Sequence, residues 1–489
     1  IIGLSAKISS SSVIVTFLNI VLLGIYIKSV GASEYGRFSS IILATSLPMM
    51  VVGFFPFGTA LLYFSSKLFE EGKSDLFYCK ARVLIQLNLL SSFFLAVLFA
   101  LFHEPFFRDV LQKPDLIPLW PWAQILLILQ AVNIYETFLL AIGRIEKSYE
   151  IRILTTCLKF TASILILLFS SFDVRLLLII HTGVLVLNLA LALYVSRDHL
   201  VSIINTKAHI LEEAREIVSP TFAETSKYLK IVSMKLVDVF AVRYSTYQVI
   251  TSYRIFLMLL DIAKTLVFDP LSQAFFTVAS KDVTEERDKI FVRTSLLIKA
   301  PGALFILLLL LSMMFRPFII QSISFFEFGI DPVIGERSIE IFLLLSSLIS
   351  LGYLSAMIAR VMHEPKLLVW TSVARLVFTI FGFFVLFHLP SQVLHGYGAM
   401  LVITTGYAGR GMITLYYLIH NLRMMIHRTL LLPICSLLSA LLMLSHTSFW
   451  PLFFAFIGCI ALFSHSLLTP SERTLLLGMV RNMKSRQES

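Results

Sequence analysis

The sequence predicts an all-α protein that crosses a membrane about fourteen times. Hydrophobic residues make up 57% of its 489 residues and charged residues only 14%, and the mean hydropathy is +0.87. Because soluble globular proteins carry about 25% charged residues, the composition excludes that class. Windows of about 20 mostly apolar residues recur along the chain, and each is long enough to span the hydrocarbon core of a bilayer as a helix.

Charged or Gly/Pro-containing loops separate the apolar windows and set their order and approximate bounds. The seventh and eighth windows carry more charge than the others, so hydropathy alone would score them low. The windows comprise residues 9–30, 38–64, 83–102, 119–142, 153–170, 174–195, 219–243, 248–275, 294–314, 338–360, 366–388, 397–420, 428–446 and 448–468.

The distribution of Lys and Arg between alternate loops predicts the orientation in the membrane. With the N-terminus in the cytoplasm, the loops on that side hold about 23 Lys and Arg, and those on the opposite side hold about 8. Both termini are therefore expected in the cytoplasm. The net charge of +10 reflects this asymmetry next to anionic lipid, so it gives no reason to expect a nucleic-acid partner. The longest loops, of about 25 residues, are too short for a soluble catalytic domain.

The cysteines predict neither a disulfide nor a metal centre. They fall in cytoplasmic or membrane segments and show no CxxC spacing. We therefore expect no metal and no cofactor. The residues concerned are Cys79, Cys157, Cys435 and Cys459.

Short matches between the two halves of the chain predict an internal repeat. Ile142-Gly143-Arg144 recurs as Ile358-Ala359-Arg360, and Lys159 recurs as Arg375, at a displacement of about 216 residues. Each match alone is weak, and chance agreement among common residues is the alternative. A six-helix repeat keeps the same orientation in both halves, so the two lobes are expected to be parallel, with a site between them.

The repeat sets the expected domain boundaries. The linker mixes charged and apolar residues as an amphipathic helix at the cytoplasmic surface would, and a solvated connector is equally compatible with it. We expect an N-lobe of six helices at 1–195, the linker at 196–218, a C-lobe of six helices at 219–425, and two further helices with a basic tail at 426–489.

Charge is concentrated on one face of each of the seventh and eighth predicted helices. Charged side chains are costly at bilayer depth, so they usually mark a cavity, an ion path or a substrate site. The two faces are slightly cationic in sum, which favours an anionic cargo. The residues are Glu224, Lys227, Lys230, Lys235 and Asp238 on the seventh helix, and Arg254, Asp261, Lys264 and Asp269 on the eighth.

Several short motifs resemble one known family of membrane proteins. They are Gly31-Ala32-Ser33-Glu34-Tyr35-Gly36, Lys235-Leu236-Val237-Asp238, Tyr253, Asp269-Pro270-Leu271 and Gly396-Tyr397-Gly398-Ala399. Together with the helix layout over about residues 5–425, they resemble the polysaccharide transport family, which includes the O-antigen and capsule flippases. The chain departs from that pattern at Thr251, where a glycine is expected, and at Arg254, which is unusually polar for its position.

The resemblance implies the multidrug, oligosaccharidyl-lipid and polysaccharide exporter superfamily, whose members alternately open two six-helix lobes to each side of the membrane. It implies a monomeric, non-enzymatic flippase in the bacterial cytoplasmic (inner) membrane. Such a flippase moves polyprenyl-diphosphate-linked sugar repeats from the inner to the outer leaflet among membrane lipids, and a polysaccharide polymerase is a possible partner.

A diphosphate cannot cross hydrocarbon unaided, so a flippase needs cationic side chains in a wet cleft. The candidates for contact with the diphosphate are Lys159, Lys227, Lys230, Lys235, Arg254, Lys264, Lys299, Arg375 and Arg410.

Buried carboxylates are candidates for coupling transport to a proton or sodium gradient, because burial can bring their titration near neutral pH. Salt-bridge partnership with the nearby lysines is the alternative role. The candidates are Glu136, Glu224, Asp238 and Asp261.

Other functions remain open at this stage. A multidrug or small-molecule exporter of the same superfamily would more naturally have an acidic and aromatic lining. A membrane enzyme acting on polyprenyl-linked sugars should show a large extracytoplasmic loop or clustered acidic residues for a metal, and the sequence shows neither. A non-transporting scaffold should neutralise its charges internally, so that removing them would impair folding instead of transport.

Overall fold

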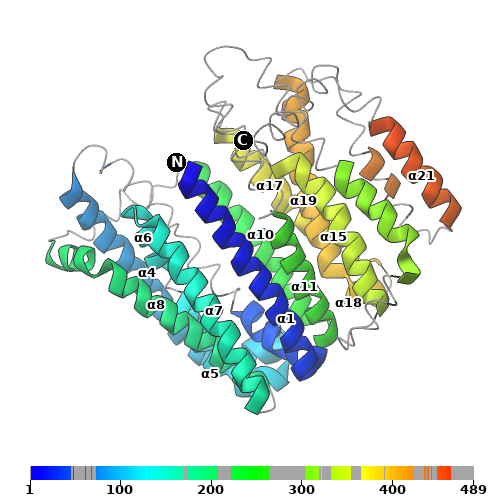
Figure 1. Cartoon of the computed structure of the whole chain (residues 1–489). Helices are drawn as coiled ribbons and strands as arrows, with labels where there is room; N and C mark the ends of the chain where they lie inside the picture. Colours follow the sequence, from blue (N-terminus) through cyan, green and yellow to red (C-terminus); the bar gives the residue numbers. More distant parts are fainter. Residues whose placement is uncertain are drawn as a thin grey trace, which may run out of the picture. The chain divides into compact units, whose positions relative to one another are not determined.

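The computed structural model is helical wherever it describes the chain (Figure 1). The described residues are 2–45, 73–130, 133–169, 173–206, 222–264, 303–318, 332–353, 365–389, 391–421 and 449–463, with isolated positions between these ranges. The all-helical prediction is thus confirmed for this part of the chain. The number of fourteen helices and the repeat relation between the two halves stay predictions.

The chain divides into two compact units. Unit 1 contains residues 1–254, 327–330 and 394–396, and unit 2 contains the rest, so the division falls inside one helix. The helices of unit 1 are α1 (Ile2–Ala44), α4 (Ser74–Pro105), α5 (Trp120–Gln130), α6 (Asn133–Ala141), α7 (Ile145–Phe169), α8 (Val174–Asn205), α10 (Phe222–Tyr244) and the first part of α11 (Tyr247–Ala263).

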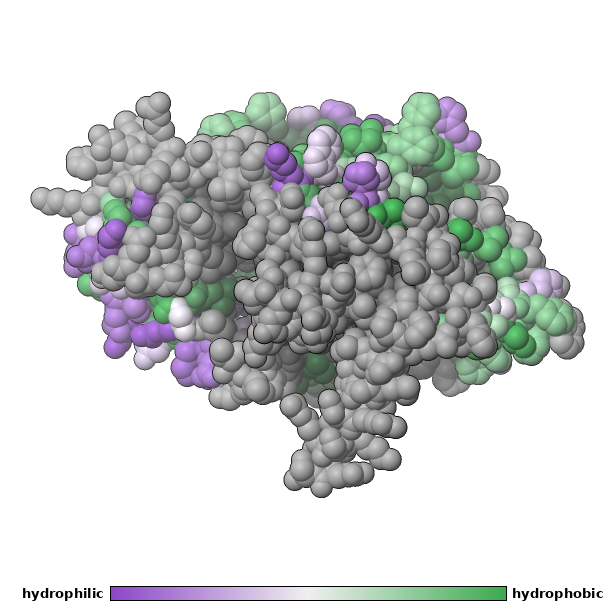
Figure 2. Space-filling model, turned by 90° about the horizontal axis from the view of Figure 1, so that it is seen from above, coloured by the Kyte–Doolittle hydropathy of each residue, from purple (hydrophilic) through white to green (hydrophobic). Residues whose placement is uncertain are grey.

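Four described helices are long and apolar enough to cross a membrane: Val13–Ala44, Ser74–Val110, Val174–Asn205 and Lys366–Leu386. Their outward faces are apolar; on α4, for example, Leu90 and Phe93 are each 65% exposed. Figure 2 shows such hydrophobic residues reaching the described surface at several places. Water would make this exposure unfavourable, whereas lipid does not. The protein is therefore a multi-pass membrane protein.

Helix α1 passes through the end predicted for the first apolar window without a loop. Gly31 adopts φ 82° and ψ 157° inside α1 and breaks it, a conformation that favours glycine. The helix then continues to Ala44, and the Ser40 hydroxyl donates to the Gly36 carbonyl at 2.8 Å. The residues after position 30 were expected to form a loop, but one glycine in the left-handed region is enough to redirect the chain.

Helix α1 is central to unit 1, because it packs against α5, α7, α8 and α10. A separate apolar core lies among α4, α6 and the end of α8. In it the rings of Phe77 and Phe138 are fully buried and stack with their centroids 6.3 Å apart. The Arg144 guanidinium, just before α7, donates to the Val195 carbonyl of α8 at 2.7 Å. These contacts fix α7 and α8 against α1, where the charged residues of unit 1 lie.

In unit 2, α19 (Gly398–Asn421) packs closely against both α15 (Pro332–Tyr353) and α17 (Pro365–Leu386). A Cβ at Gly406 would collide with Thr379, and one at Gly409 with the ring of Phe378, so both glycines let α19 approach α17 closely. Unit 2 also contains α21 (Phe449–Leu462) and a helical segment at 303–318. Of the predicted linker, α8 covers the first part to Asn205; residues 207–218 lie outside the described part.

Candidate functional site

Two cations meet inside unit 1. Lys159 of α7 and Arg254 of α11 are close enough to repel each other electrostatically. Both are also close enough to interact electrostatically with the imidazole of His181 on α8. Lys159 and Arg254 are partly exposed. Within the described part of unit 1, neither forms an ion pair with a carboxylate. Two uncompensated cations at one place create a positive potential that an anion can neutralise.

An aromatic wall borders the two cations. Lys159 Nζ lies 6.0 Å from the centroid of the Tyr26 ring, and Tyr26 stacks on Tyr35 with centroids 6.4 Å apart. The row continues from Tyr35 to Phe38 at 5.6 Å and from Phe38 to His181 at 5.9 Å, edge to face. Arg254 is within hydrogen-bonding reach of the Tyr35 hydroxyl. All three rings of α1 are buried, so the site combines two cations, which can bind phosphate groups, with a packed aromatic support.

Hydrogen bonds hold this wall in place. Ser163 donates its hydroxyl proton to the Lys159 carbonyl at 2.7 Å, so its oxygen is left to accept from the Tyr26 hydroxyl at 2.6 Å. This chain ties α1 to α7 directly beside the Lys159 side chain. It fixes the Tyr26 ring under the ammonium group, an arrangement that costs little further ordering when a ligand binds.

Asp238 of α10 is neutralised within unit 1. Its side chain is 5% exposed and accepts from Lys235 Nζ at 3.2 Å and from the Tyr253 hydroxyl at 2.8 Å. Two roles were expected for Asp238, ion coupling and salt-bridge partnership with a nearby lysine. The structure shows the salt bridge. Lys235 is correspondingly less available for an anionic cargo than Lys159 or Arg254.

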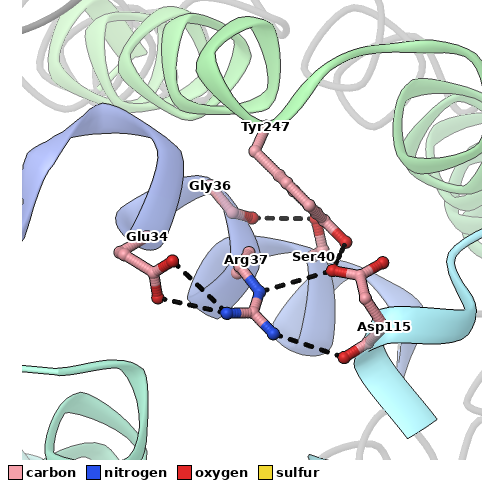
Figure 3. A network of polar contacts seen from close by, with 6 residues as sticks. All are labelled: Glu34, Gly36, Arg37, Ser40, Asp115 and Tyr247. Carbon is pink, nitrogen blue, oxygen red and sulfur yellow. Dashed lines mark hydrogen bonds and ion pairs between the residues drawn. The ribbon is translucent and has the colours of Figure 1, made fainter.

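A second polar network joins the break in α1 to the loops at one end of unit 1 (Figure 3). Arg37 pairs with Glu34 at 3.3 Å and with the Asp115 carboxylate at 3.4 Å, and the Tyr247 hydroxyl donates to Asp115 at 2.6 Å. Burial, aided by the hydrogen bond to Asp115, raises the pKa of the Tyr247 phenol, so it remains a donor. Asp115 belongs to the short 3-10 helix Pro114–Leu119 between α4 and α5.

Backbone contacts strengthen the same end of unit 1. Lys113 Nζ donates to the Ser245 carbonyl at 3.0 Å, and burial lowers the pKa of its ammonium group. The Thr251 hydroxyl donates to the Ala32 carbonyl at 2.6 Å. Thr251 is the residue that departs from the family pattern, and its hydroxyl ties α11 to the break in α1. By the predicted orientation, this end of unit 1 faces away from the cytoplasm.

In unit 2, the repeat partner of Lys159 has a related setting. The Arg375 guanidinium of α17 lies 4.2 Å from the centroid of the Tyr407 ring on α19 and is 2% exposed. Its Nη1 has no hydrogen-bond partner among the described residues. Arg410, also on α19, is 9% exposed. Both cations are therefore interior residues of unit 2.

For the remaining predicted site residues, the structure gives at most the helix or the exposure of the side chain. Lys230 is exposed on α10, and Asp261 and Lys264 are exposed on the part of the chain assigned to unit 2. The structure assigns Glu136 to α6, and Glu224 and Lys227 to α10, without describing their side chains, and Lys299 lies outside the described residues.

Sequence reasoning did not single out Tyr26, Tyr35 or His181 as members of the Lys159 site. Tyr26 and Ser163 are 137 positions apart, so their contact leaves no local pattern in the sequence. A polar His181 inside the apolar window 174–195 was the one available signal, because ionisable residues in membrane helices are rare and usually face the interior.

Comparison with known proteins places the fold. No protein-family model matches the chain, and no curated protein matches it. Among solved structures, a multidrug resistance MATE family transporter of the MOP superfamily, in its inward-facing conformation, superposes with a TM-score of 0.66 over 82% of this chain and 93% of its own, at 13% identity. The chain has the MOP-superfamily transporter fold.

Two further structures support this assignment of the fold. The lipid II flippase MurJ, in an inward closed conformation, superposes with a TM-score of 0.59 at 16% identity, covering 95% of this chain and 98% of its own. A MOP superfamily transporter from Pyrococcus furiosus, described as having a binding pocket of reverse polarity, gives 0.55 at 15% identity over 87% and 95%. Multidrug exporters and a lipid-linked substrate flippase thus share this fold, so the fold alone leaves the cargo open.

Proposed function

We propose that the protein is a flippase that moves polyprenyl-diphosphate-linked oligosaccharides from the cytoplasmic to the outer leaflet of the bacterial cytoplasmic membrane by alternating access. The observation that carries this proposal is the pair of cations, Lys159 and Arg254, without a carboxylate partner in the described part of unit 1. A site of this charge attracts an anion and repels a cationic drug.

The two side chains suit the two kinds of contact that a diphosphate needs. Arg254 can hold two phosphate oxygens at once through its planar fork, whereas Lys159 acts as a point charge that tolerates several geometries. The rings of Tyr26 and Tyr35 are buried and stack on each other, so they help to position the two cations, and the contacts with the anion are left to Lys159 and Arg254. The lipid-linked cargo of the structurally similar MurJ supports the same class of substrate.

A small-molecule exporter is the second candidate, because multidrug exporters of the MATE family share the fold. The cargo that fits the Lys159 site would then be a soluble organic anion. Coupling to a proton or sodium gradient and cooperation with a polysaccharide polymerase belong to the flippase proposal as further expectations. In the part of the chain searched, no cluster of His, Cys, Asp and Glu suited to a metal is present.

The test is sided mass spectrometry of polyprenyl-diphosphate sugars in native cells with and without the protein. Loss of the protein should accumulate the lipid-linked sugar in the cytoplasmic leaflet, and the intact protein should reverse this. Lys159→Gln combined with Arg254→Gln should not reverse it, because the anion loses both charged contacts. At about 1.4 kcal/mol per tenfold change, losing one such contact should lower transport about tenfold or more.

Lys147→Gln with Arg197→Gln provides the matched control, because it also removes two cations from unit 1. Both side chains are exposed, at 56% and 69%, so this variant should transport normally. Equal amounts of folded protein are verified by gel filtration in detergent. Unchanged lipid-linked sugars in both leaflets of cells lacking the protein would contradict the flippase proposal and favour export of a soluble anion.

A further inference from the structure

A set of buried charges lies in unit 2. Near the start of α15, Glu336 is 1% exposed, Arg337 is 6% exposed and Glu340 is 2% exposed. Arg337 Nη1 contacts Glu340 at 2.6 Å, and Arg316 Nε, from the helical segment 303–318, contacts Glu336 at 2.8 Å. Three of these four residues stand between the predicted windows 294–314 and 338–360, and Glu340 lies at the start of the second, so in sequence they resemble an ordinary polar helix end.

The two carboxyl groups lie side by side. Glu336 and Glu340 are four positions apart and so share one face of α15, and they are near enough to form a hydrogen bond with each other and to repel each other when both are ionised. Arg316 Nε forms an ion pair with Glu336 Oε1 but not a well-aligned hydrogen bond, so neither oxygen of Glu336 has a hydrogen-bond partner in the described part of unit 2. A buried carboxyl oxygen without a donor is costly, and a proton on one of the two groups supplies that donor.

The surroundings favour a proton over a metal cation. Arg316 and Arg337 already place two positive charges next to the two carboxyl groups. These charges would repel a sodium ion. On the elements packed against α15, the other charged or titratable groups among the described residues are few. They are Tyr397 next to α19, then Arg410, His420 and three further tyrosines on α19, and Cys435 in the segment around Ser436, whose hydroxyl meets Ser347 of α15.

We propose that Glu336 and Glu340 share one exchangeable proton and form a proton-binding site in unit 2. With the proton, the four side chains carry a net charge of +1; after its release, they are neutral. A buried charge that changes in this way stabilises one arrangement of the surrounding helices over another. The site thus gives a MOP-type fold a means of responding to a proton gradient, and it does not depend on the identity of the cargo.

Infrared spectroscopy of the full-length protein in lipid nanodiscs tests the site directly. A titration in H2O and D2O should show, besides the bands of the exposed carboxyl groups, one carbonyl band of a protonated carboxyl group that persists after the exposed groups have ionised; this band shifts in D2O and disappears as the pH rises further. Glu336→Gln and Glu340→Gln should each lack this band, because the amide takes over the hydrogen bond and the remaining carboxylate stays ionised. Glu150→Gln, which alters a carboxylate that is 59% exposed, should retain it.

Three results would overturn the proposal. The first is a wild-type protein without this persistent carboxyl band, a result that does not depend on whether the variants fold. The second is a band that persists in both glutamine variants, which would place the proton elsewhere. The third is loss of the wild-type band on adding sodium chloride at constant pH, which would identify the pair as a metal-cation site.

Discussion

Individual charged residues inside unit 1 differ in what they contact. Asp238 is buried but satisfied by Lys235 and Tyr253, whereas Lys159 and Arg254 lie beside other cations. A buried ion with two partners is a stabilising part of the scaffold, because removing a partner exposes the other charge to the low dielectric. A pair of like charges lowers stability, which is why we propose a binding role for Lys159 and Arg254.

Tyr253→Phe should therefore destabilise the protein. The Tyr253 ring is 1% exposed and remains after the substitution, but Asp238 loses a 2.8 Å hydrogen bond. A hydrogen bond to a charged group stabilises by about 1.5–3 kcal/mol, so the midpoint of thermal unfolding in detergent should fall by a few degrees. Tyr194→Phe, which alters a ring that is 69% exposed, should leave the midpoint unchanged. Equal midpoints for the two variants would show that Asp238 does not need this donor.

At the scale of helices, glycine decides how closely α1 approaches α11. Gly36 lies against the backbone of Tyr247, and a Cβ on Gly36 would overlap that backbone. The close approach brings Arg37 and Tyr247 to the same carboxylate, Asp115. Because the obstacle is backbone and not the end of a flexible side chain, the helices themselves would have to move apart.

Gly36→Ala should lower stability by about 1–3 kcal/mol through this overlap and should loosen the Arg37, Asp115 and Tyr247 contacts. Gly24→Ala is the matched control on the same helix, since nothing lies within 4 Å of a Cβ built there, and alanine favours the helix by about 0.5–1 kcal/mol. Thermal unfolding followed by tryptophan fluorescence compares the two. The interpretation fails if Gly36→Ala unfolds at the same temperature as Gly24→Ala.

At the scale of the whole molecule, each unit has its own interior cation over an aromatic ring. Lys159 lies near Tyr26 in unit 1, and Arg375 lies over Tyr407 in unit 2. These are the two residues that the predicted internal repeat brings into register, about 216 positions apart. If both cations contribute to binding one anionic cargo, removing both should lower its transport more than removing either one alone.

The double variant Lys159→Ala with Arg375→Ala should remain folded and should lower transport of diphosphate-linked cargo more than each single variant. Transport is measured by the leaflet distribution of the lipid-linked sugar, and folding by gel filtration and thermal unfolding. Lys147→Ala with Arg197→Ala removes two exposed cations and serves as the reference. Normal transport by the first double variant would exclude a shared role for the two cations.

The sequence alone determined the features that depend on local composition. Apolar windows predicted a helical, multi-pass membrane protein, because a backbone in lipid must satisfy its hydrogen bonds within helices. The end of the first window at residue 30 coincides with the break at Gly31, but the continuation of α1 to Ala44 was not predicted. The charged face of the eighth predicted helix singled out Arg254, and the repeat match with Arg375 singled out Lys159; their function in transport stays a prediction.

Only the tertiary structure decided which charges have partners. It pairs Asp238 with Tyr253 and leaves Lys159 beside Arg254; it adds Tyr26 and His181 to that site, and it sets Glu336 against Glu340. The physical reason is that a helix fixes spacing along one face, whereas the electrostatic state of a side chain depends on groups from other helices. In this chain those groups are as far apart in sequence as Ala32 and Thr251, 219 positions.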